Sequence, residues 1–108
     1  MNYSNIVSHL FKRVPDFNSI YGNQNTDLPY VVFGSLALYL CKLIHDGDKE
    51  ILLGRSFKFL NEMALSEDRD VINLLVTGVL EVIADDNLCK RKAINYMSDE
   101  CQRRLNEI

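Results

Sequence analysis

Two of the side chains best suited to chemistry lie one helical turn apart. Cys41 and His45 are four positions apart in an apolar segment, so an α-helix places them on the same face. A thiolate and an imidazole are both zinc ligands, but a structural zinc site needs four. A Cys–His nucleophilic pair needs a third group that orients the imidazole, and no neighbouring residue supplies it. We therefore interpret both side chains as structural and predict no metal site.

The rest of the sequence lacks the short motifs that carry catalysis. His9 is the other histidine, and there is no G-x-S-x-G, no glycine-rich phosphate loop and no H-E-x-x-H. Ser35, inside a helical pattern, is interpreted as structural. Cys89 and Cys101 complete an odd set of three cysteines without C-x-x-C spacing, so we expect three free thiols in a reducing cytosol. The sequence predicts no catalytic residue, no cofactor and no enzyme activity.

Charge is distributed unevenly along the 108 residues. The net charge is −3, which argues against non-specific nucleic-acid binding. Residues 46–86 carry ten acids and four bases, whereas the remainder carries more bases than acids. The basic run at residues 90–92 is interpreted as a solvated helix face. A helix-turn-helix is the alternative, and the acidic joint before this run argues against it.

Hydrophobic spacing of about 3.6 residues predicts helices along the whole chain. The predicted segments are 6–14, 16–21, 27–45, 48–64 and 68–83, then shorter helices after residue 87 and after Ser98, with 22–26 as a loop. Helix 27–45 is apolar on nearly every face and is predicted to be the most buried, although its apolar stretch is too short to span a bilayer. Helix 68–83 is predicted to bury Ile72, Leu75, Val76, Val79 and Ile83. We predict an all-α fold, one domain over 1–108, and a compact antiparallel bundle of about five to six helices; a short HEAT- or armadillo-like stack is the alternative.

Short joints predict that the three long helices alternate in direction and stack in chain order. The joint at 45–49 and the joint at 85–87 then lie at the same end. Five acids are predicted to share this end, and we name them the acidic rim: Asp46, Asp48, Glu81, Asp85 and Asp86. Secondary acidic candidates are Glu67, Asp68 and Asp70. The alternative interpretation is that these acids only cap helices and occupy solvated joints.

Two apolar segments carry a resemblance to a known family. They are residues 28–34 (LPYVVFG) and 73–81 (NLLVTGVLE), followed by an amphipathic tail. Over residues 4–108 the chain resembles a family of small bacterial all-helical proteins similar to the immunity proteins encoded beside polymorphic toxins, including those of contact-dependent growth inhibition systems. One such immunity type is paired with a toxin similar to the ribonuclease A superfamily. The resemblance implies a cytosolic immunity protein that neutralises a cognate toxin, and it assigns no individual residue.

The charge distribution agrees with this expectation. Nuclease toxins carry basic residues around a phosphate-binding cleft, and an acidic surface can occupy that cleft and speed association. We therefore expect a basic nuclease toxin domain as partner, no nucleic acid or membrane, and a monomer or weak dimer when free. The alternative function is a helical adaptor or regulatory module without a toxin, which binds a partner helix in a groove between its own helices.

Overall fold

The computed structural model describes residues 1–22 and 27–108, which form helices and no strand. The elements are η1 (Tyr3–Asn5), α1 (Ile6–Arg13), α2 (Pro15–Tyr21), α3 (Pro29–Asp46), α4 (Glu50–Ala64), α5 (Arg69–Asn73), η2 (Leu74–Leu80), α6 (Glu81–Ala84), α7 (Asn87–Ala93), η3 (Ile94–Tyr96) and α8 (Asp99–Asn106). The prediction of an all-α fold is confirmed. Four residues of the predicted loop, 23–26, lie outside the described residues.

The helix ends follow local rules of backbone chemistry. Pro15 and Pro29 each occupy the first position of a helix, where the missing N–H removes no hydrogen bond. Helix α3 stops at Asp46 because Gly47 and Asp48 both adopt positive φ, at 74° and 57°. Ser98 caps α8 by accepting a hydrogen bond from the Cys101 N–H at 3.3 Å. These signals were readable in the sequence, so the predicted helix ends fall close to the observed ones.

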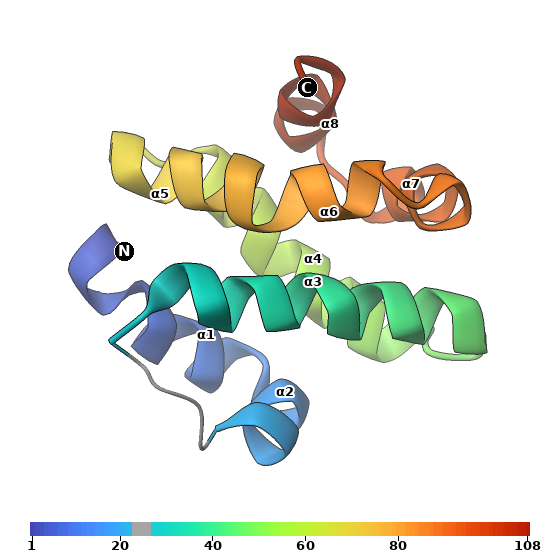
Figure 1. The fold of residues 1–108 in the computed structure, drawn as a ribbon, viewed down its shortest axis with the longest axis horizontal. Coiled ribbons are helices and arrows are strands. Elements are labelled where there is room, and N and C mark those ends of the chain that lie inside the picture. Colours follow the sequence, from blue (N-terminus) through green and yellow to red (C-terminus); the bar gives the residue numbers. More distant parts are fainter. Residues whose placement is uncertain (23–26) are drawn as a thin grey trace.

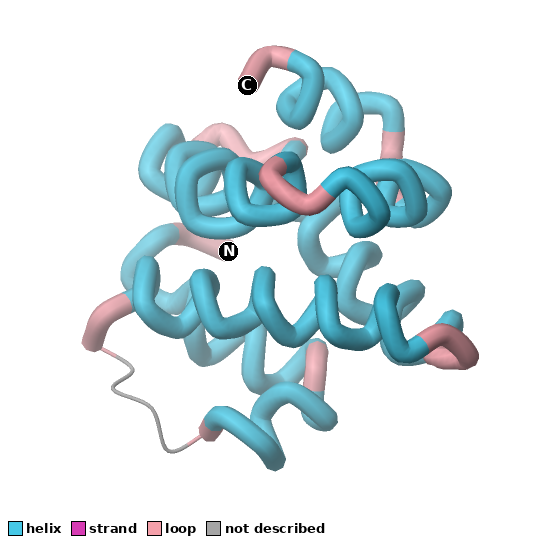
Figure 2. Tube along the Cα trace, turned by 45° about the vertical axis from the view of Figure 1, so that its right-hand side comes forward, coloured by secondary structure: helices cyan, strands magenta, loops and turns pink. Residues whose placement is uncertain are grey.

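Three long helical segments build the centre of the molecule. Helix α3 and the continuous run α5–η2–α6 lie side by side and point the same way, while α4 runs in the opposite direction behind them (Figure 1). Helices α1 and α2 cover one edge of α3, and α8 packs on α4 on the far side of the α5–η2–α6 run (Figure 2). The three long helical segments alternate in direction along the chain, as predicted. The predicted order of packing is wrong, because α3 packs most extensively on η2 rather than on α4.

The centre of the third long segment is a π-helix, Leu74–Leu80. Its wider turns change the buried register, so Val71 and Leu74 are fully buried while the predicted core residues Ile72 and Val76 are half-buried. A Cβ atom added at Gly78 would lie 3.6 Å from Phe33 Cβ. This is ordinary van der Waals contact, and the tightest neighbour would be Leu74 Cδ1 of η2 itself at 3.3 Å, so η2 packs closely on α3 here without requiring glycine for that approach.

Helix α3 is central but is not buried on every face, which corrects the prediction. Val32, Phe33 and Leu36 are fully buried, whereas Val31 is 52% and Leu38 64% exposed. Within the described part of the chain, no helix combines the length and apolarity that crossing a membrane requires. The molecule measures 31 × 29 × 20 Å along its principal axes, which is a compact bundle rather than an elongated stack.

Candidate protein-binding surface

The end of α3 is joined to the start of α7 by a polar contact. His45 Nε2 in the last turn of α3 lies 2.8 Å from Asp86 Oδ2. The other carboxylate oxygen of Asp86 accepts a hydrogen bond from the Cys89 N–H at 2.9 Å and so caps α7. The alternation of three long helices therefore brings the joints 45–49 and 85–87 together, as the sequence predicted. We name this region the α3–α7 end.

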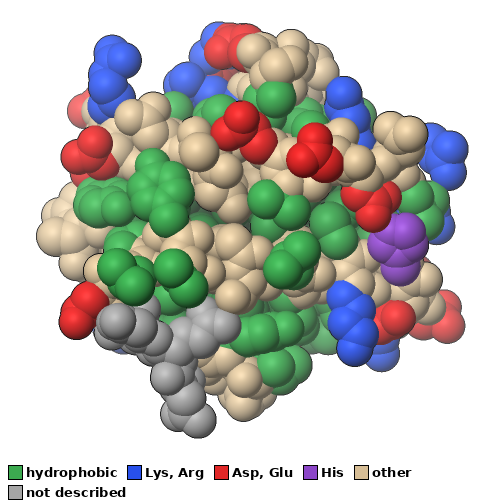
Figure 3. All heavy atoms as spheres, viewed as in Figure 1, with side chains coloured by type: hydrophobic (Ala, Val, Ile, Leu, Met, Phe, Trp, Pro, Cys, Tyr) green, Lys and Arg blue, Asp and Glu red, His purple; other side chains and the backbone are tan. Residues whose placement is uncertain are grey.

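The acidic rim residues lie at or close to the α3–α7 end. Asp46 is the last residue of α3, and Asp48 follows it in the joint; both are exposed. Glu81 and Asp85 are also exposed, one in α6 and one directly after it. Figure 3 shows acidic side chains over α6 that lead towards a histidine at the end of α3. Their role in binding a partner stays a prediction.

Asp86 differs from the other rim residues because its charge is used within the fold. The hydrogen bond from the Cys89 backbone lowers the pKa of the Asp86 carboxyl, and the contact with His45 lowers it further. Both effects stabilise the ionised form. Asp86 thus caps α7 and, through His45, clamps α7 to α3. This structural role accounts for an acidic residue at this position without any partner protein.

Lysines interrupt the acidic surface at this end. Lys92 lines a small hollow with Asp48 and Glu50, between the start of α4 and the end of α7. Lys42 and Lys49 line another hollow with Asp46. The α3–α7 end is therefore a mixed charged surface in which exposed acids alternate with lysines. Sequence reasoning placed the acids correctly but did not place these lysines beside them.

The secondary acidic candidates lie at the opposite end of the α5–η2–α6 run. Asp68 caps α5 by accepting from the Asp70 N–H, and its second oxygen accepts from the Tyr3 N–H, both at 2.9 Å. The Tyr3 hydrogen bond is the main cause of the lowered pKa of the Asp68 carboxyl. Asp68 therefore ties the N-terminal turn to the bundle. Glu67 and Asp70 are exposed beside it and do not join the acidic rim.

An exposed apolar stripe runs along α3 towards the acidic rim. Leu28, Val31 and Leu38 are 49%, 52% and 64% exposed. At the helical period these three share a face with Lys42 and Asp46, so the stripe leads into the charged α3–α7 end. We name Leu28, Val31 and Leu38 the α3 stripe. The sequence shows that this helix is apolar on nearly every face, including the exposed one. We interpreted that pattern as burial of the whole helix.

The spacing of Cys41 and His45 does not produce a joint site. Cys41 Sγ lies 2.6 Å from Cys89 Sγ, while His45 contacts Asp86 one turn further along. Within residues 1–22 and 27–108, no three His, Cys, Asp or Glu side chains are grouped to hold a metal ion. The Cys41–Cys89 pair was missed because the two residues are 48 positions apart and no spacing rule relates them.

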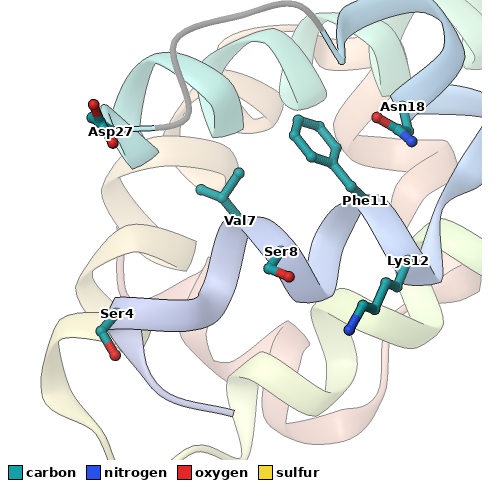
Figure 4. Close-up of a pocket in the computed structure, with 7 residues that line it drawn as sticks. All are labelled: Ser4, Val7, Ser8, Phe11, Lys12, Asn18 and Asp27. Carbon is teal, nitrogen blue, oxygen red and sulfur yellow. The ribbon is translucent and has the colours of Figure 1, made fainter.

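Two other features give no ligand site. The basic run 90–92 lies in the last turn of α7, where positive charge interacts favourably with the helix dipole. A hollow beside α1 is lined by Ser4, Val7, Ser8, Phe11, Lys12, Asn18 and Asp27 (Figure 4). The labelled polar groups there point in different directions, whereas a small-molecule site needs a few that converge.

One family model matches residues 7–107, and its description is a domain of unknown function, DUF7674. Comparison with curated proteins and with solved structures finds no match. The family match covers nearly the whole chain but carries no description of an activity. Function must therefore be inferred from the surface.

Proposed function

We propose that this chain, which belongs to the DUF7674 family, binds a basic protein partner with the acidic rim and the adjoining α3 stripe and thereby neutralises it. The observation that carries this proposal is the continuity of the two features on α3. Val31 and Leu38 are exposed, and the same helical face ends at Asp46 in the acidic rim. An apolar centre with a charged border is the usual anatomy of a protein–protein interface.

The charge of the rim favours a basic partner. Asp46, Asp48 and Asp85 are exposed, so their carboxylates are open to cationic groups of another protein. Acidic surfaces of this kind steer a basic partner during diffusion and raise the association rate. Three lysines lie among these acids and reduce the net negative charge of the surface: Lys42, Lys49 and Lys92. We therefore expect the partner to match acids and lysines individually, rather than to be held by the net charge alone.

The specific form of the proposal is a cytoplasmic immunity protein. The resemblance of residues 4–108 to immunity proteins supports it, with a nuclease toxin domain as the partner. Such an inhibitor blocks the toxin's cleft and needs no catalytic group of its own. The acidic rim would then take the place of the phosphates of the toxin's substrate.

A groove elsewhere on the molecule favours a second function, that of a helical adaptor. It lies between α4 and the start of α8 and is lined by Lys58, Asn61, Leu65, Asp99 and Glu100, with contributions from Arg13 and Glu62. Leu65 is 71% exposed beside it. An amphipathic partner helix binds such a groove through an apolar side chain. The lining of this groove shares no residue with the acidic rim, so variants separate the two functions.

The proposal is tested with the protein encoded next to this chain. Its C-terminal domain is purified and assayed for nuclease activity on RNA, with and without an equimolar amount of this chain. We expect a one-to-one complex and loss of nuclease activity. The Leu65→Glu variant should inhibit as well as the wild type. Inhibition that depends on Leu65 would favour the adaptor surface, and absence of a complex would overturn the immunity proposal.

A further inference from the structure

Cys41 and Cys89 form a thiol pair that joins two helices. Cys41 lies in α3 and Cys89 in α7, and their sulfur atoms are 2.6 Å apart. A disulfide bond requires about 2.05 Å between the sulfurs, so bond formation needs a movement of only about half an ångström. The two sulfur atoms are thus placed for covalent linkage.

The neighbouring polar contacts hold the two thiols in this position. Asp86 accepts from the Cys89 N–H at 2.9 Å and contacts His45 at 2.8 Å. Because His45 lies one turn after Cys41 on α3, this clamp fixes the crossing of α3 and α7 directly beside the sulfur atoms. The backbone positions of the two cysteines are therefore set by the fold.

The two thiols differ in exposure and in acidity. Cys41 is half-buried and open to a small oxidant, whereas Cys89 is fully buried. The hydrogen bond between the two sulfur atoms lowers the pKa of the Cys41 thiol, and His45 contributes in the same direction, whereas burial and Asp86 act against this shift. The same hydrogen bond raises the pKa of Cys89. Cys41 is thus the thiol that reacts first with an oxidant, and Cys89 is the thiol that reacts second, with the oxidised Cys41.

We propose that Cys41 and Cys89 are an oxidation site, at which hydrogen peroxide forms an intramolecular disulfide between α3 and α7. The Cys41 thiolate attacks one peroxide oxygen, the O–O bond breaks, and hydroxide leaves and takes up the proton released from Cys41. The Cys89 sulfur then attacks the resulting Cys41 sulfenic acid, the S–O bond breaks, and water leaves. The two thiols lose two electrons, and one peroxide becomes two waters. The site is independent of the proposed function.

The experiment treats the fully reduced chain with a small excess of hydrogen peroxide. We expect the number of titratable thiols in denaturant to fall from three to one, a mass loss of about 2 Da, and a linked peptide that contains Cys41 and Cys89. The oxidised protein should melt at least about 5 °C higher because a crosslink restricts the unfolded chain. Dithiothreitol should reverse each change.

Matched variants assign the roles of the thiols. Cys101→Ala keeps the pair and should behave as the wild type, while Cys41→Ser should keep both remaining thiols reduced under the same treatment. In Cys89→Ser, a sulfenic-acid trap such as dimedone should label Cys41. Three intact thiols after treatment, a crosslink that includes Cys101, or labelling of Cys89 before Cys41 would each overturn the proposal. The wild-type mass and peptide map decide the question even where a variant folds poorly.

Discussion

His45 Nε2 lies 2.8 Å from Asp86 Oδ2, and this contact fastens the last turn of α3 to the first turn of α7. The same carboxylate caps α7 through the Cys89 N–H. One side chain therefore stabilises a helix terminus and sets the relative position of two helices. The acidic rim and the thiol pair both lie beside this contact.

The first prediction concerns Asp86. Replacement by alanine removes both the cap and the clamp, so Asp86→Ala should melt at a lower temperature than the wild type. Asp85→Ala, at an exposed neighbouring position, should melt close to the wild type. Thermal unfolding followed by circular dichroism measures both. Equal melting temperatures for the two variants would show that the clamp contributes nothing.

The contribution of Asp86 should also depend on pH. Because hydrogen bonds lower its pKa in the folded state, its stabilisation is complete above the unfolded pKa of about 3.9. It is lost as the pH falls from there through the lower folded value. The difference in melting temperature between wild type and Asp86→Ala should therefore shrink below about pH 4. A difference that grows on acidification would contradict this assignment.

The second prediction compares two glycines. Gly47 has φ 74° and ψ 173°, a conformation that is nearly restricted to glycine, so Gly47→Ala should destabilise the fold by about 1–3 kcal/mol. Gly54 lies inside α4 with open space around its Cα, so Gly54→Ala should stabilise by up to about 1 kcal/mol. Urea unfolding of both variants measures the free energies. The two changes in unfolding free energy must have opposite signs. A loss of stability in Gly54→Ala would contradict the open space around this position.

The third prediction tests which face of α3 is exposed. Leu36 is fully buried and Leu38 is 64% exposed. Leu36→Ala should cost about 2–5 kcal/mol of unfolding free energy, because it leaves a cavity in the core. Leu38→Ala should change it by no more than about 0.5 kcal/mol. Similar losses at both positions would mean that the α3 stripe is covered.

Local chemistry made most helix ends predictable from the sequence. Pro15, Pro29, Gly47 and Ser98 each act through their own backbone or side chain, and a single sequence shows such effects directly. The meeting of the joints at 45–49 and 85–87 was also predictable, because it follows from short connections and alternating directions. The packing of α3 on η2 was not, because chain order does not determine which long helices touch.

Three features could not be read from the pattern. The π-helix at Leu74–Leu80 moves Ile72 and Val76 out of the core, and an analysis that assumes 3.6 residues per turn cannot detect it. Exposed and buried leucines of α3 have the same side chain, so hydrophobicity alone does not separate Leu36 from Leu38. The contact of Cys41 with Cys89 is a tertiary relation between distant positions.

The most direct test of the proposed function measures association with the C-terminal domain encoded by the neighbouring reading frame, immobilised on a sensor surface, at two salt concentrations. Asp46→Lys combined with Asp85→Lys should weaken binding strongly, with part of the loss in the association rate, and wild-type association should slow as salt rises because screening acts over about 8–10 Å. Lys12→Glu combined with Arg69→Glu serves as the matched control and should have a much smaller effect, because both bases are exposed and line neither hollow at the α3–α7 end. Melting curves confirm that each variant is folded. Unchanged affinity in the Asp46/Asp85 variant, or a larger loss in the Lys12/Arg69 variant, would contradict binding through the acidic rim.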